Sequence, residues 1–88
     1  METVRWYRLA AEQGYATAQS SLGDMYNDGY GVPEDAVLAY MWYNLAAAQG
    51  IESAQTNKDI IEQRMTREQI AEAQRLSREW LEAHPGGN

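Results

Sequence analysis

Cysteine is absent from this chain of 88 residues, and other features of catalytic or membrane proteins are missing with it. Without cysteine the chain has no disulfide framework, no thiolate metal site and no cysteine nucleophile. No run of residues approaches the ~20 apolar positions that span a bilayer, so membrane insertion is not expected. A chain of this length makes one small domain, residues 1–88.

Basic residues are few and scattered along the chain. Seven Lys and Arg against 13 Asp and Glu give a net charge of −6. Nucleic acids and anionic membrane surfaces are bound by clustered Lys and Arg, so neither is an expected partner. The N-terminal residues have no apolar core of the signal-peptide type. A cytoplasmic location is the default prediction, and a periplasmic one stays open if the chain is part of a longer protein.

The residues that carry chemistry in other proteins lack the neighbours they need here. His84 is the only histidine and lies in the C-terminal tail, where general-base catalysis finds neither a partner nor a pocket. Gly29 and Gly31 lack the third glycine and the preceding strand of a nucleotide-binding loop. Asp24 and Asp28 share a helical face, but a cation site needs more oxygen ligands. The sequence predicts no catalytic residue, no cofactor and no metal site.

A repeat is the strongest positive signal. The segment Trp-Tyr-Arg-Leu-Ala-Ala-Glu-Gln-Gly at 6–14 reappears as Trp-Tyr-Asn-Leu-Ala-Ala-Ala-Gln-Gly at 42–50. Over 6–19 and 42–55, nine of 14 positions are identical at an offset of 36 residues. A period of this length is too long for one helix and is typical of a helix–turn–helix pair.

Start and stop signals predict five helices. Gly14, Gly29 and Gly50 follow helix ends, where glycine accepts the left-handed conformation. Asp35 is a predicted N-cap, and Thr66 begins a capping box. The predicted helices cover 2–13, 16–28, 36–49, 52–64 and 67–83, followed by a frayed tail from residue 84. No segment shows the alternation of apolar and polar residues that is typical of a strand, so the predicted fold is all-α.

Small residues on the predicted buried faces let neighbouring helices come close. Gly23 lies in the middle of a helix, where it costs about 1 kcal/mol relative to alanine, so a side chain there is expected to strike the adjacent helix. The side chains predicted to fill the core are Trp6, Leu9, Leu22, Tyr26, Tyr40, Trp42, Tyr43 and Leu45. The residues assigned a structural role are Gly14, Gly23, Gly29, Gly31, Trp42 and Gly50.

The pattern of the repeat resembles a known family. It consists of Ala18, Leu22, Gly23, Tyr26, Gly29, Gly31, Val32 and Asp35, followed by Ala39, Trp42, Tyr43, Ala46, Ala47, Gln49 and Gly50. This pattern closely resembles the Sel-1-like repeat, a relative of the tetratricopeptide repeat. The resemblance implies a right-handed α-solenoid, or superhelix, used as an adaptor or scaffold in protein complexes, often bacterial.

The resemblance divides the chain into parts. Residues 15–50 form a complete repeat, 1–14 the second helix of a partial repeat, and 51–64 a divergent partial repeat. Residues 65–84 form a capping helix and 85–88 a tail. Lys58 and Asp59 stand where Leu22 and Gly23 would recur, so close repeat packing is expected to end there. The apolar stripe predicted for the cap consists of Ile70, Ala73, Ser77, Trp80 and Leu81.

Two surfaces are predicted to bind protein. In stacked helical hairpins the first helix of each repeat lines the concave face, which predicts a polar, mildly acidic strip suited to a basic or polar segment of another protein. Its residues are Thr17, Ser20, Asp24, Asn27, Asp28, Ser53, Thr56, Ile60 and Gln63. The first helix has no preceding partner, so Trp6, Tyr7 and Leu9 are candidates for self-association. Tyr15 and Tyr30 lie in predicted turns, within reach of a partner.

The leading hypothesis is a non-catalytic protein–protein interaction module. The alternative is a structural module that forms a homo-oligomer through its first helix. A remote alternative is enzymatic, because some cysteine-rich bacterial members of the resembled family are described as hydrolases of β-lactams. Here the cysteines of that branch are missing, and no nucleophile–base pair is evident.

Overall fold

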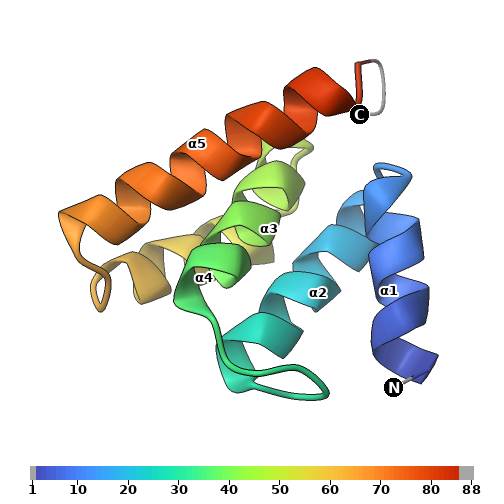
Figure 1. Ribbon diagram of the computed structural model, residues 1–88, viewed down its shortest axis with the longest axis horizontal. Helices are drawn as coiled ribbons and strands as arrows, with labels where there is room; N and C mark the ends of the chain where they lie inside the picture. The colour runs from blue at the N-terminus through green and yellow to red at the C-terminus, as the bar shows by residue number, and fades with distance from the viewer. Residues whose placement is uncertain (1, 86–88) are drawn as a thin grey trace.

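The computed structural model describes residues 2–85, and all of their regular structure is helical (Figure 1). The five helices are α1 (Glu2–Glu12), α2 (Ala16–Asp28), α3 (Ala36–Ala48), α4 (Glu52–Glu62) and α5 (Arg67–Ala83). The predicted all-α fold of five helices is confirmed. The starts of all five helices agree with the prediction, while α1, α3 and α4 end one or two residues earlier than expected.

The predicted helix signals act as expected. Gly14, Gly29 and Gly50 have positive φ angles of 95°, 70° and 99°. The carboxylate of Asp35 accepts a hydrogen bond from the Leu38 amide at 3.1 Å, which caps α3. Thr66 and Gln69 form the capping box of α5 in both directions. Local side chains therefore cap the starts of α3 and α5, and glycines with positive φ follow the ends of α1, α2 and α3.

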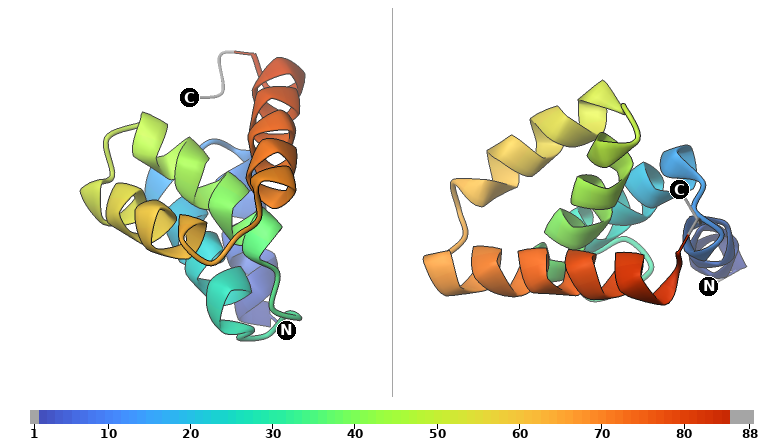
Figure 2. Two further views of the ribbon diagram at one scale, coloured as in Figure 1. Left: turned by 90° about the vertical axis from the view of Figure 1, so that its left-hand side faces the viewer. Right: turned by 90° about the horizontal axis from the view of Figure 1, so that it is seen from above.

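Helix α3 is the centre of the fold. It packs against α2, α4 and α5, while α1 packs against α2 at the other end of the molecule (Figure 1). Seen from above, α3 lies between α4 and α5, which diverge from their shared turn (Figure 2). Its sequence explains this position, because seven of its 13 residues are buried: Ala39, Tyr40, Met41, Trp42, Tyr43, Leu45 and Ala46.

The contact between α2 and α3 depends on Gly23. A Cβ atom at this position would lie 2.7 Å from Cδ1 and 2.8 Å from Cε1 of Tyr43, distances that real side chains do not reach. The predicted close approach is confirmed, and the group that a side chain would strike is the Tyr43 ring. Tyr43 is fully buried by this contact.

A hydrogen-bond network joins the two inter-repeat turns. Buried Gln19 donates from its side chain to the carbonyl of Ala11 at 3.1 Å. The Gln49 amide donates to Oε1 of Gln19 at 3.0 Å and to the carbonyl of Gly14 at 2.9 Å. Gln55, the repeat equivalent of Gln19, is exposed and bonds to Asp59 instead.

The apolar stripe of α5 is close to its prediction, with one correction. Ile70, Ala73, Ser77 and Trp80 face the core, but Leu81 is exposed. Leu76 takes part in the apolar face in its place, because it lies three residues after Ala73 and in line with Trp80. Trp80 packs edge-on against Trp42 of α3, with ring centroids 6.1 Å apart.

The tail prediction is wrong for its first residue. The ring of His84 stacks on Trp80 with centroids 3.9 Å apart, and its Nδ1 lies 2.7 Å from the Trp80 carbonyl oxygen. Stacking on an aromatic ring holds a side chain that sequence alone places in a frayed end. The rest of the predicted tail beyond Pro85 lies outside the described residues.

We expect Gly23→Leu to destabilise the protein by about 1–3 kcal/mol, because the added side chain would have to displace the Tyr43 ring. Chemical denaturation measures the change. Thr17→Leu, an exposed position on the same helix, is the matched control and is expected to stay within about 0.5 kcal/mol of wild type. Equal stability of the two variants would contradict the close contact.

We expect Gln19→Ala to lower the free energy of unfolding by about 1–3 kcal/mol, because it leaves buried partners without hydrogen bonds. Gln55→Ala removes the same side chain at the repeat-equivalent exposed position and is expected to change stability by less than about 0.5 kcal/mol. Urea denaturation of the two variants side by side is the measurement. A Gln55→Ala loss as large as that of Gln19→Ala would refute the assignment.

Candidate functional site

The predicted concave strip lies on α2 and α4, which contact each other. On α2, Thr17, Asp24 and Asp28 are exposed, and Ser20 and Asn27 are half-buried. The α4 members of the strip are all exposed: Ser53, Thr56, Ile60 and Gln63. Ile60 is 53% exposed and is the one large apolar side chain among the predicted strip residues.

Asp24 already has partners inside the protein. Its Oδ1 accepts a hydrogen bond from the Tyr43 hydroxyl at 2.5 Å, and Nδ2 of Asn57 lies 3.5 Å from the same oxygen. Asp24 therefore joins α2 to α3 and α4. Of the two acidic side chains predicted for the strip, Asp28 is the one without such a bond in the described residues.

A second bridge closes one end of the strip. Arg64, just beyond α4, donates to the side-chain oxygen of Asn27 at 3.0 Å. A surface pocket of about 220 Å³ opens beside this bond, lined by Asn27, Glu34, Ala36 and Arg64. Asn57 and Arg64 were not among the residues predicted for the strip. For Asn57 a signal was present, because it lies three residues before Ile60 and so on the same side of α4.

Two buried tyrosines next to the strip resist ionisation. Burial, followed by the hydrogen bond to Asp24 and its charge, raises the pKa of Tyr43 far above its usual value of 10.0. Burial and the nearby Glu62 carboxylate raise the pKa of Tyr40 as well. The Tyr40 hydroxyl donates to Glu62 Oε2 at 3.2 Å, so each tyrosine ties α3 to a neighbouring helix.

The first helix exposes the other predicted surface. Trp6 is 69% and Leu9 54% exposed, which corrects their assignment to the core. Both point away from α2, because Val4 and Ala11 occupy the side of α1 that packs against it. Tyr7 is half-buried against the core, so Trp6 and Leu9 are the large apolar side chains that α1 offers to a partner.

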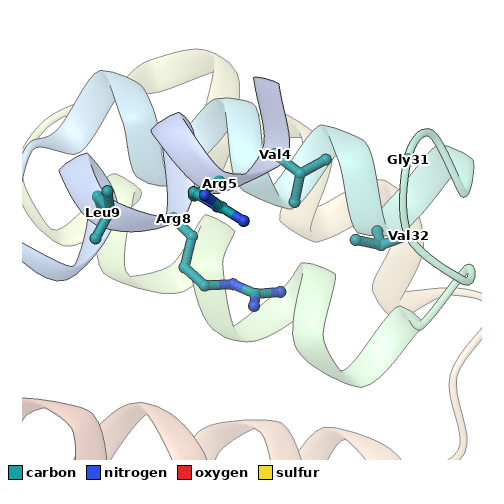
Figure 3. A pocket seen from close by; sticks show the side chains of 6 residues that line it. All are labelled: Val4, Arg5, Arg8, Leu9, Gly31 and Val32. Carbon is teal, nitrogen blue, oxygen red and sulfur yellow. The ribbon is translucent and has the colours of Figure 1, made fainter. Parts of the chain in front are cut away.

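The α1 pocket lies between this helix and the loop that joins α2 to α3. It has a volume of about 320 Å³ and is lined by Val4, Arg5, Arg8, Leu9, Gly31 and Val32. Figure 3 shows Val4 and Val32 close together, with the guanidinium groups of Arg5 and Arg8 extending toward the loop side. Arg8 is held in place by a hydrogen bond to the Tyr26 hydroxyl at 2.9 Å.

In residues 2–85, the described part of the chain, no three His, Cys, Asp or Glu side chains come together as metal ligands would. None of its helices combines the length and the apolarity that crossing a membrane requires.

We expect Tyr43→Phe to flatten the loss of stability at alkaline pH. Below about pH 10 both folded and unfolded chains keep the Tyr43 proton, and stability is complete; above it the unfolded chain loses that proton while the folded chain keeps it. The free energy of unfolding of the wild type therefore falls as pH rises above 10. Urea denaturation from pH 9 to 11 measures the slope, and an equally steep fall in the variant would contradict the raised pKa.

Comparison with known proteins assigns the repeat. The family model of the Sel1 repeat matches residues 2–15 and 16–51, more than half of the chain. The chain is also similar, with a TM-score of 0.84 and 36% sequence identity over 90% of its length, to a protective antigen present in uropathogenic Escherichia coli strains and displaying an SLR fold. It spans 17% of that antigen chain. No curated protein sequence matches it. With its 36-residue period and helical hairpins, the chain belongs to the Sel1 repeat family.

Proposed function

We propose that the protein is a non-catalytic interaction module that binds a polar segment of another protein along the α2–α4 strip. The Sel1 repeat is a scaffold for protein contacts in general terms, and the proposal narrows this to one face. The proposal assigns no chemistry to the strip, whose side chains are hydroxyls, amides, carboxylates and one apolar anchor.

The observation that carries the proposal is the open surface around Ile60. This side chain is 53% exposed, and the same segment carries Asn57 of α4 and Arg64 just beyond it, which bond to residues of α2. An exposed apolar side chain surrounded by polar groups is typical of an interaction surface, where a few anchors supply most of the binding energy. Because hydrogen bonds fix the surrounding groups, little conformational freedom is lost on binding.

The chemistry of the strip favours a polar partner segment of mixed charge. Asp28 offers a carboxylate to a basic or hydroxyl-bearing side chain. Arg64 and Glu34, of opposite charge, both line the pocket beside Asn27. The internal bonds of Asp24 reduce what it can offer, so the strip is less acidic than the sequence alone predicts. A shallow strip over two helices is suited to modest affinity.

The test uses surface variants that leave the internal bonds intact. We expect Asp28→Lys combined with Ile60→Asp to abolish capture of bound proteins by the immobilised chain, because the anchor and the free carboxylate are both lost. Glu82→Lys combined with Leu81→Asp makes the same changes on the exposed side of α5 and is expected to capture as wild type does. Mass spectrometry of the captured proteins is the measurement. Identical capture by both pairs would reject the strip as the binding face.

A further inference from the structure

We infer that the α1 pocket and the exposed side chains beside it bind a second kind of partner segment, one that carries a carboxylate next to a large aliphatic side chain. The inference concerns α1 and the α2–α3 loop. It is independent of the α2–α4 strip, because the two surfaces share no residue. In addition, α1 and α4 lie on different sides of the central hairpin, which α2 and α3 form (Figure 1).

The α1 pocket carries a local positive charge. The chain carries seven basic residues, and two of them, Arg5 and Arg8, line this one pocket. Among the side chains that the structure describes, neither forms a salt bridge, although the chain carries 13 acidic residues. Paired guanidinium groups match the geometry of a carboxylate and bind it through charge-assisted hydrogen bonds. The net charge of −6 weighs little against this, because charges beyond about 8 Å are screened at physiological salt.

Apolar side chains lie in the α1 pocket and beside it. Val4 and Val32 lie close together in the pocket, and Leu9 lines it from the same helix as the arginines (Figure 3). Trp6, 69% exposed, and Leu9, 54% exposed, extend the apolar area along α1. Tryptophan and arginine together are the residues most enriched at interface hot spots. An aliphatic side chain next to the bound carboxylate would cover this surface.

Comparison of equivalent positions in the repeat favours an acidic segment over another helix as the occupant of the α1 surface. Arg5 and Leu9 correspond, at the offset of 36 residues, to Met41 and Leu45 of α3, which are 7% and 1% exposed. In α3 this position is built for burial under neighbouring helices. Arginine in place of methionine makes the same position of α1 unsuited to an apolar helix, because an unpaired charge would be buried.

A second copy of the chain is disfavoured by symmetry. In a two-fold contact the same patch of both copies meets, which would bring Arg5 and Arg8 of one copy toward those of the other. Like charges at an interface cost binding energy unless acidic groups separate them. The acidic segment of a different protein satisfies both arginines without this cost.

The test measures binding of a defined probe. A fluorescein-labelled decapeptide in which Glu and Asp alternate with Leu is titrated with the full chain and followed by fluorescence anisotropy. A peptide with Gln and Asn in place of the acids is the control probe. We expect saturable binding of the acidic peptide, weakened by added salt, and at least about fivefold weaker binding of the amide peptide.

Two double variants test whether the peptide binds at α1. We expect Arg5→Gln with Arg8→Gln to weaken binding at least about fivefold, while Arg67→Gln with Arg78→Gln, which removes the same charge from α5, leaves it unchanged. If loss of the Arg8–Tyr26 bond disturbs the fold of the double variant, Arg5→Gln alone tests the pocket with that bond in place. Absence of binding, equal binding of both peptides, or equal weakening by both double variants would each overturn the inference. So would light scattering that shows a dimer broken by Trp6→Ala with Leu9→Ala, since the face would then be occupied by a second copy.

Discussion

The ring of Tyr43 lies against the bare backbone of Gly23, and its hydroxyl reaches across to Asp24. This contact sets the spacing of α2 and α3, and α3 in turn positions α4, α5 and, through α2, the first helix. Any larger residue at Gly23 would move the central hairpin apart. The same contact engages one carboxylate oxygen of the exposed Asp24, so it affects both the packing of the core and the chemistry of the strip.

The repeat is regular where hydrogen bonds cross from one unit to the next and irregular where they are lost. Gln19 and Gln49 join the turns on either side of the complete repeat. Gln55 makes no such bond. Helix α4 is instead bonded to α3 through Tyr40 and Glu62, and α5 packs on α3 through Trp80 and Trp42. Along the chain, the contacts between successive helices thus change from a polar network to aromatic packing.

The two candidate binding surfaces differ in how the fold prepares them. The α2–α4 strip is stiffened by bonds from Asn57 and Arg64 to α2, and its apolar contribution is Ile60. The α1 surface combines exposed Trp6 and Leu9 with two arginines, one of them held by Tyr26. One of these faces has mixed charge and the other a local positive charge, and the two proposals assign a chemically different partner segment to each.

The sequence by itself determined the helices, the repeat and the family, because glycine stops, caps and the 36-residue period act locally or through near-identical segments. It also determined that Gly23 marks a close approach. Only the tertiary structure decided which side chain fills that space, which polar residues of the strip are already bonded, and that Arg5, Arg8 and the loop at Val32 form one pocket. These features join residues far apart in the chain, and periodicity gives the face of a helix but not the side chain it meets on the next one. The exposure of Trp6 and the burial of Trp42 show this limit, since the two tryptophans lie at equivalent positions of similar segments and differ in what packs against them.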